Sequence, residues 1–150
     1  MVSNVVLSAD IPYLKIHKNS FHKLKPRIVY DIPLVGNALE AAIIAVAHVD
    51  NEVLFPRYID QIKCKVKNDV ASNALSKRLS TIIDECKTMR PFHHTMQTRL
   101  RDAECLEDVR EELIGWQKDV SKSYGSLSNL KIKNRYLLES LAWKRQGVSL

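Results

Sequence analysis

The part of this sequence richest in side chains capable of chemistry is residues 86–96, CKTMRPFHHTM. A cysteine with the adjacent His93 and His94 suggests either zinc binding or a nucleophile paired with a base. A structural zinc site needs about four converging ligands, usually in close pairs such as CxxC or HxxxH, and the C-x6-H-H spacing supplies no such pair. Adjacent side chains also diverge on a helix or a strand. We interpret the stretch as a bend, with Arg90 and Pro91 ending one helix, and predict no metal site.

The remaining reactive side chains form no motif with a known mechanism. The three cysteines, Cys64, Cys86 and Cys105, are odd in number and make no CxxC arrangement, so we expect reduced thiols buried on helix faces. The four glycines are isolated from one another, and neither a GxGxxG nor a Walker loop is present to hold a phosphate. We therefore predict a protein that is not an enzyme and uses no cofactor.

Length and composition are those of one globular domain. The chain has 150 residues, of which 45% are hydrophobic and 27% charged, enough to build a core without disulfides or metals. The first residues lack the charged and apolar regions of a signal peptide. The longest apolar run, residues 38–49, contains Glu40 and His48 and falls short of the ~20 residues that a membrane helix needs. We expect an intracellular protein, cytoplasmic or nuclear and not secreted, with no membrane insertion.

The elements that must position these residues change in character near residue 32. Residues 1–32 hold short β-leaning runs (NVVL, YLKIH, RIVYDI) separated by Asn, Ser, Asp and Pro, which favours an extended or short β N-terminal arm. Residues 33–150 show apolar positions at helical spacing. The fold prediction is an all-α antiparallel bundle of five or six helices with a short irregular or β-ribbon N-terminal arm.

The apolar periodicity also sets the expected helices. They fall at about 34–49, 57–66, 71–89, 93–103, 106–120 and from 130 to near Gly147. The helix over 34–49 is apolar around most of its circumference, so we expect it in the middle of the bundle. The helix over 106–120 has acidic residues in its first turns and lysines in its last, which complements the helix macrodipole.

The last two helices carry more apolar width than one core-facing stripe requires, and large apolar and aromatic residues are typical of interface centres. We therefore predict an interaction module that self-associates or docks on another helical protein, of the adaptor or viral accessory type. The expected interface residues are Trp116, Val120, Tyr136, Leu138 and Trp143.

Charge supports an alternative, binding of RNA or DNA. The net charge is +6, and both ends of the chain are basic and interleaved with aromatic residues. Cations neutralise phosphates and aromatic faces stack on unpaired bases, although no RNP, KH, helix-turn-helix or zinc-finger pattern is present. The expected contacts are Lys15, Lys18, Lys23, Lys25, Arg27, Lys131, Lys133, Arg135, Lys144 and Arg145. Nucleic-acid affinity falls steeply with salt, whereas an apolar interface persists.

Overall fold

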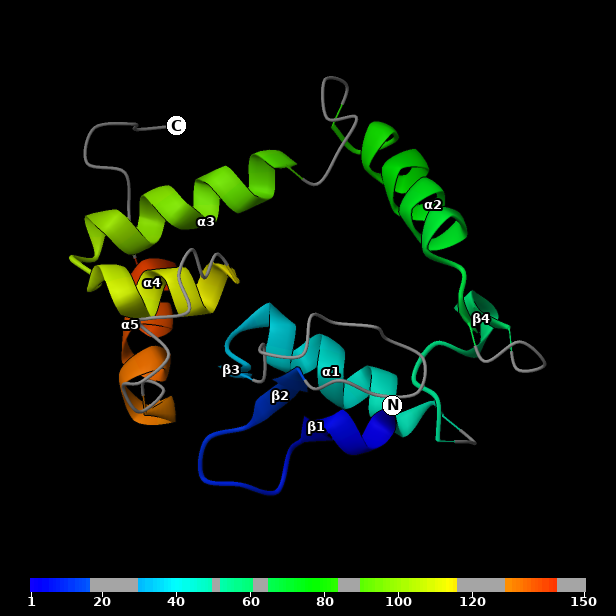
Figure 1. Ribbon diagram of the computed structural model, residues 1–150, viewed down its shortest axis with the longest axis horizontal. Helices are drawn as coiled ribbons and strands as arrows, with labels where there is room; N and C mark the ends of the chain where they lie inside the picture. Colours follow the sequence, from blue (N-terminus) through cyan, green and yellow to red (C-terminus); the bar gives the residue numbers. More distant parts are fainter. Residues whose placement is uncertain (17–29, 50–51, 61–64, 84–89, 116–128, 143–150) are drawn as a thin grey trace.

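A computed structural model of the chain describes residues 1–16, 30–49, 52–60, 65–83, 90–115 and 129–142. Within these ranges it contains five α-helices, two 3-10 helices and two small antiparallel sheets (Figure 1). The helices are α1 Asn37–Ala47, α2 Asn68–Ser80, α3 Arg90–Asp102, α4 Glu107–Ile114 and α5 Leu130–Ala142, with 3-10 helices η1 Val2–Asn4 and η2 Pro56–Tyr58. The strands are β1 Val5–Val6, β2 Tyr13–Ile16, β3 Tyr30–Pro33, β4 Ile59–Asp60 and β5 Lys65–Val66.

The predicted all-α bundle is wrong, because the fold is mixed. The N-terminal segment forms a three-stranded antiparallel sheet in the order β1-β2-β3, and β3 packs against α5. Leu14 pairs with Val5 on one side and with Ile32 on the other. Aliphatic and β-branched residues favour such a pleated surface, and residues 8–12 supply the polar and proline positions of the connecting turn.

The helix expected over 57–66 is also wrong. Residues 56–58 form η2, and β4 then pairs with β5, placing Ile59 opposite Val66. A short apolar run fits helical and strand spacing equally well, so periodicity alone does not separate the two. Here the β-branched Ile59 and Val66 follow their strand preference.

Side-chain hydroxyls explain why α2 is shorter than the predicted 71–89. The Ser80 hydroxyl donates to the carbonyl of Lys77 at 2.9 Å, and the Thr81 hydroxyl donates to the carbonyl of Arg78 at 2.7 Å. Ser and Thr compete in this way for backbone carbonyls and favour helix ends. Helix α2 therefore ends at Ser80, and residues 84–89 lie outside the described ranges.

The core lies where α3, α4 and α5 meet. Its buried members are Leu100, Cys105, Val109, Tyr136 and Leu137, and the partly buried Val35 before α1, Met96 of α3, and Leu113 and Ile114 of α4 pack around them. Each fully buried Leu or Val side chain contributes about 1.5–3 kcal/mol. Helix α4 is capped by Gly115, whose φ of +76° is the left-handed conformation that glycine adopts without strain.

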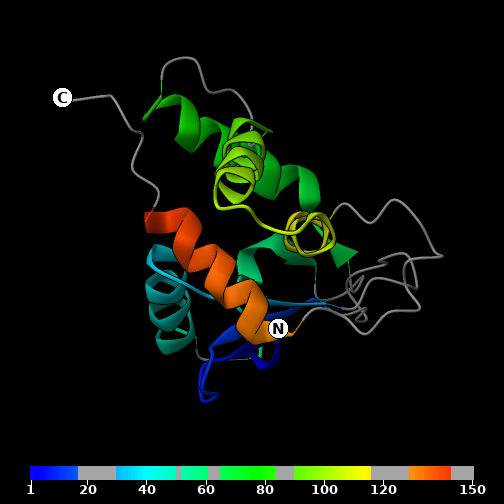
Figure 2. The same cartoon turned by 90° about the vertical axis from the view of Figure 1, so that its left-hand side faces the viewer.

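Helix α1 is apolar nearly all round, as predicted, but its expected place in the middle of a bundle is wrong. None of its residues is buried; its start lies near the C-terminal end of α5, and the rest of the helix runs away from α5 (Figure 1 and Figure 2). Gly36, the residue before α1, lies against α5, and a Cβ added there would lie 3.1 Å from Cδ1 of Leu141. Gly36 also has a φ of +52°, which L side chains rarely adopt.

Candidate protein-interaction surface

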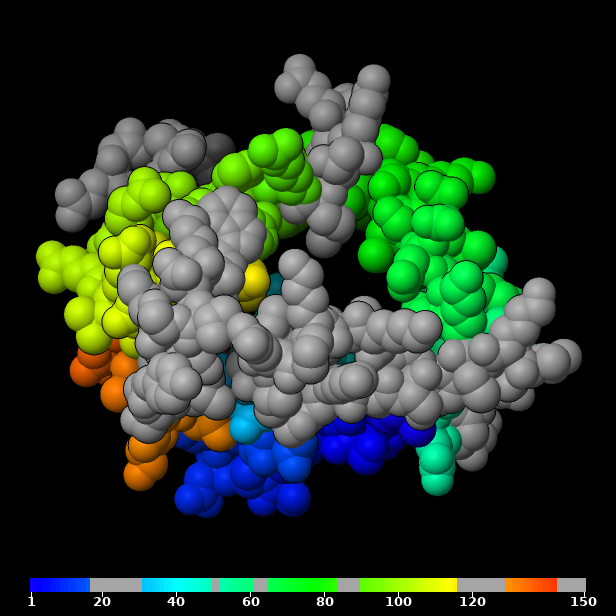
Figure 3. Space-filling model, in the orientation of Figure 1, coloured from blue at the N-terminus to red at the C-terminus, as the bar shows by residue number. Residues whose placement is uncertain are grey.

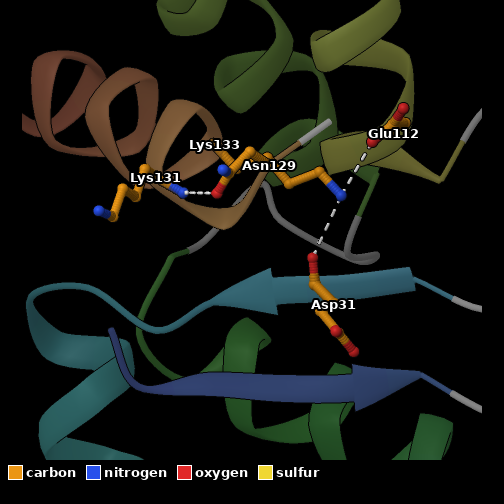
Figure 4. Close-up of polar contacts among 5 residues, drawn as sticks. All are labelled: Asp31, Glu112, Asn129, Lys131 and Lys133. Atoms are coloured by element: carbon orange, nitrogen blue, oxygen red, sulfur yellow. Dashed lines mark hydrogen bonds and ion pairs between the residues drawn. The ribbon is translucent and has the colours of Figure 1, made fainter. Parts of the chain in front are cut away.

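The rotation of α5 about its axis is fixed by one buried cation, Lys133. Its Nζ atom forms an ion pair with Oε2 of Glu112 on α4 at 2.8 Å and donates to the backbone oxygen of Asp31 on β3 at 3.3 Å (Figure 4). Only 3% of the Lys133 side chain and 12% of the Glu112 side chain are exposed. A buried ammonium requires such partners, because desolvating a charge without them costs several kcal/mol.

The Lys133 contacts join α5 to the preceding helix α4 and to β3, which lies 102 residues earlier at Asp31. Figure 4 shows the Asp31 carbonyl turned away from β2 and towards α5, so Lys133 satisfies an acceptor on the outer edge of the sheet. At the start of the same helix, the side-chain oxygen of Asn129 accepts from the backbone N–H of Lys131 at 3.0 Å, as an N-cap does.

Because Lys133 is directed inward, helix geometry sets the direction of the other side chains of α5. Lys133, Tyr136, Leu137 and Ser140 are spaced by three and four residues, and all are buried. Leu138 is one residue, or about 100°, beyond Leu137 and is therefore directed away from the core. Half of its surface is exposed.

The end of α5 that carries Leu138 and Leu141 lies against Gly36, the residue before α1. We define the α1–α5 patch as Ile43 and Ile44 of α1 with Leu138 and Leu141 of α5. The exposed fractions of these four residues lie between 48% and 59%. Because Gly36 directly precedes α1 and lies against Leu141, the start of α1 adjoins the end of α5, and Figure 2 shows both helices on one side of the molecule. Groups of half-exposed aliphatic side chains, unlike single scattered ones, are typical of binding sites, which makes these four residues the candidate.

Charges of both signs occur on these two helices. Nε of Arg135 lies 3.7 Å from Oε1 of Glu139, one turn further along α5, and both side chains are about half exposed. The guanidinium carbon of Arg135 also lies 4.6 Å from the ring centroid of Tyr136. Glu40 on α1 and Lys131 on α5 are exposed. Such exposed pairs contribute little to stability, but they balance the charge near the patch.

The predicted interface residues have different positions in the structure. Leu138 is exposed and belongs to the α1–α5 patch, whereas Tyr136 is buried in the core. Trp116, Val120 and Trp143 lie outside the described residues.

The structure also locates four of the predicted nucleic-acid contacts. Lys131 is exposed, Arg135 is paired with Glu139, and Nζ of Lys15 lies 5.7 Å from the ring centroid of Tyr13. Lys133 is enclosed by protein and held by its ion pair. The others, outside the described ranges, are Lys18, Lys23, Lys25, Arg27, Lys144 and Arg145.

The two histidines of the opening motif occupy the first turns of α3. Arg90 Nε donates to Nε2 of His94 at 3.3 Å, and the rings of His93 and His94 meet edge to face at 6.5 Å. Among the described residues, no group of three or more His, Cys, Asp or Glu side chains is placed to hold a metal ion. The third member of the motif, Cys86, is outside those residues.

Cys105 is the one reactive side chain buried in the described core. Burial raises its pKa from 9.0 to about 11, because the apolar surroundings disfavour the thiolate. Its Sγ lies 3.6 Å from the carbonyl oxygen of Leu106, to which the thiol donates. A thiol in this state packs as a small apolar group and is a poor nucleophile.

The sequence interpretation missed three of the four patch residues, Ile43, Ile44 and Leu141. The signal was present in the apolar circumference of α1, which we assigned to a bundle centre. The apolar residues of α1 are recognised as exposed only from the structure, in which none of the residues of α1 is buried.

Comparison of the chain with protein-family models, with curated proteins and with solved structures finds no match. Over the described residues, no helix has both the length and the apolar character needed to cross a lipid bilayer.

Proposed function

We propose that this protein is a non-catalytic interaction module that associates with a second copy of its own chain through the α1–α5 patch. The observation that carries the proposal is helix α1. Nine of its eleven residues are apolar, and none is buried. A helix that is apolar on all sides is normally covered on all sides, so the open face of α1 favours a protein partner.

The balance of charge supports a second copy as that partner. In a twofold contact the same patch meets itself, so a rim of one sign would oppose like charges across the interface. Glu40 and Glu139 here balance Lys131 and Arg135, although the whole chain carries a charge of +6. Docking on a different protein is the alternative. A different protein that is recognised by its charge would favour a patch rim of the opposite charge, and such a rim would carry charges of one sign.

The size of the patch sets the expected affinity. Covering the exposed half of four aliphatic side chains on each of the two copies contributes about 6–12 kcal/mol, at about 1.5–3 kcal/mol for each complete side chain. Association costs about 4–15 kcal/mol in lost freedom, so most of this contribution is offset. We expect a dissociation constant in the micromolar to millimolar range, not the nanomolar range.

Single substitutions test the position of the interface. Ile44→Asp and Leu138→Asp place a carboxylate within the patch, and each is expected to weaken self-association at least tenfold in sedimentation equilibrium. Ile132→Asp is the matched control, because Ile132 is also exposed on α5 but lies outside the patch. Weakening by the control alone, or by all three variants equally, would contradict the assignment.

The alternative of nucleic-acid binding is tested on the same samples. A short RNA is added at low and at physiological salt. Complex formation that falls steeply with salt and survives Ile44→Asp would favour the alternative. Self-association that is insensitive to both salt and RNA supports the α1–α5 patch.

A further inference from the structure

A second group of exposed apolar side chains lies at the other end of the helical region. Ile82 and Ile83 follow Thr81, the C-cap residue of α2, and Phe92 is in the first turn of α3. Their exposed fractions lie between 42% and 63%. Figures 1 and 2 both show the end of α2 near the start of α3. We define the α2–α3 tip as these three residues together with Lys77, Arg78 and Arg90.

The tip is separate from the core and from the α1–α5 patch. No residue of α2 is buried, and its main tertiary contact is with η2. The core lies towards the other end of α3, around Leu100. In the space-filling view, α2 forms an outer edge of the molecule (Figure 3). Its apolar side chains are thus available to another surface.

The described charges at the tip are all positive. Lys77 and Arg78 lie in the last turn of α2, Arg90 begins α3, and all three are exposed. The described residues between 77 and 94 include no carboxylate. When every residue from 77 to 92 in the sequence is counted, there are four cations and two carboxylates. The tip therefore combines large apolar side chains with a net positive charge.

We propose that the α2–α3 tip docks on the surface of an anionic lipid bilayer. Peripheral proteins bind such surfaces by placing apolar side chains at the headgroup boundary while nearby Lys and Arg attract the lipid charge. Ile82 and Ile83 suit this boundary better than they suit RNA, because aliphatic side chains offer no flat face on which bases stack. Phe92 is the single aromatic residue among the three.

The tip lies on the bilayer and does not cross it. Each apolar side chain inserts only as far as the acyl boundary, and the cations remain at headgroup depth. Binding therefore requires both the apolar side chains and the cations of the tip. Neutral vesicles remove the attraction for Lys77, Arg78 and Arg90, and high salt screens it.

Co-sedimentation with vesicles tests the proposal. The full chain is mixed with phosphatidylcholine vesicles with and without phosphatidylserine, at low and physiological salt. We expect binding to the anionic vesicles that weakens with salt, and at least tenfold weaker binding to neutral ones. Equal binding to both kinds of vesicle, or none to either, would overturn the proposal.

Variants separate the apolar part from the charged part. Ile82→Ser is expected to lower the vesicle partition coefficient about tenfold, and Arg78→Gln severalfold with a shallower salt dependence. The matched control Ile132→Ser removes an exposed isoleucine elsewhere and is expected to bind as the wild type does. Unchanged thermal unfolding of all three variants shows that the fold is retained. Binding of a short RNA that Phe92→Ala abolishes, without vesicle binding, would assign the tip to nucleic acid instead.

Discussion

Replacing Lys133 by Met tests the contact that sets the orientation of α5. Met has a similar length without a charge, so the change removes the ion pair with Glu112 and the hydrogen bond to the Asp31 carbonyl. It leaves the carboxylate of Glu112, with 12% of its side chain exposed, without the cation at 2.8 Å. Most of the expected cost comes from this carboxylate.

The magnitude follows from that burial. Removing one partner of a buried ion pair costs about 3–5 kcal/mol, because the remaining charge keeps its desolvation penalty. For a chain of 150 residues, this lowers the melting temperature by about 6–20 °C. The double variant Lys133→Met with Glu112→Leu removes both charges and is expected to recover most of the loss. Lys131→Met is the matched control, because Lys131 is exposed on the same helix, and is expected to cost less than about 0.5 kcal/mol.

Urea unfolding with linear extrapolation measures these differences. If Lys133→Met falls within about 1 kcal/mol of the wild type, or the double variant is as unstable as the single one, the ion pair does not position α5.

Two further predictions use the same assay. Leu100→Ala is expected to lower the free energy of unfolding by about 2–5 kcal/mol, because Leu100 is fully buried. Leu106→Ala is expected to lower it by less than about 0.5 kcal/mol, because Leu106 is mostly exposed. Equal losses of stability in the two variants would contradict the assigned core. Because burial raises the pKa of Cys105 from 9.0 to about 11, its contribution to stability is fully present below pH 9.0 and is lost as pH rises through about 11. The free energy of unfolding is therefore expected to fall more steeply over this range in the wild type than in Cys105→Ala, and parallel pH profiles would contradict the buried thiol.

The helices with strong periodicity could be predicted from the sequence. The helix expected from Leu130 is confirmed as α5 as far as Ala142, where the described residues end, and α4 begins within a residue of the expected start at 106. The inward direction of Lys133 was missed, although its spacing to Tyr136, Leu137 and Ser140 places all four on one helix face. A lysine is assigned to solvent by default, and only the position of Glu112 on another element makes its burial favourable.

The mixed fold could not be predicted in the same way. Strands of two to four residues, such as β1 and β4, are stabilised by their neighbours in the sheet and carry little local signal. The position of α1 depends on which surfaces of the sheet and of α5 are free to contact it. This depends on the tertiary structure and is not encoded in the local sequence of α1. The apolar composition of α1 was predictable, and its exposure was not.

The α1–α5 patch is tested most directly by the mass of the wild-type protein in solution. Sedimentation equilibrium at physiological salt, over loading concentrations from about 10 μM to 1 mM, covers the expected range of affinity. We predict that the apparent mass rises with concentration from 17.2 kDa towards twice that value. A mass that stays at 17.2 kDa throughout would contradict self-association through this patch.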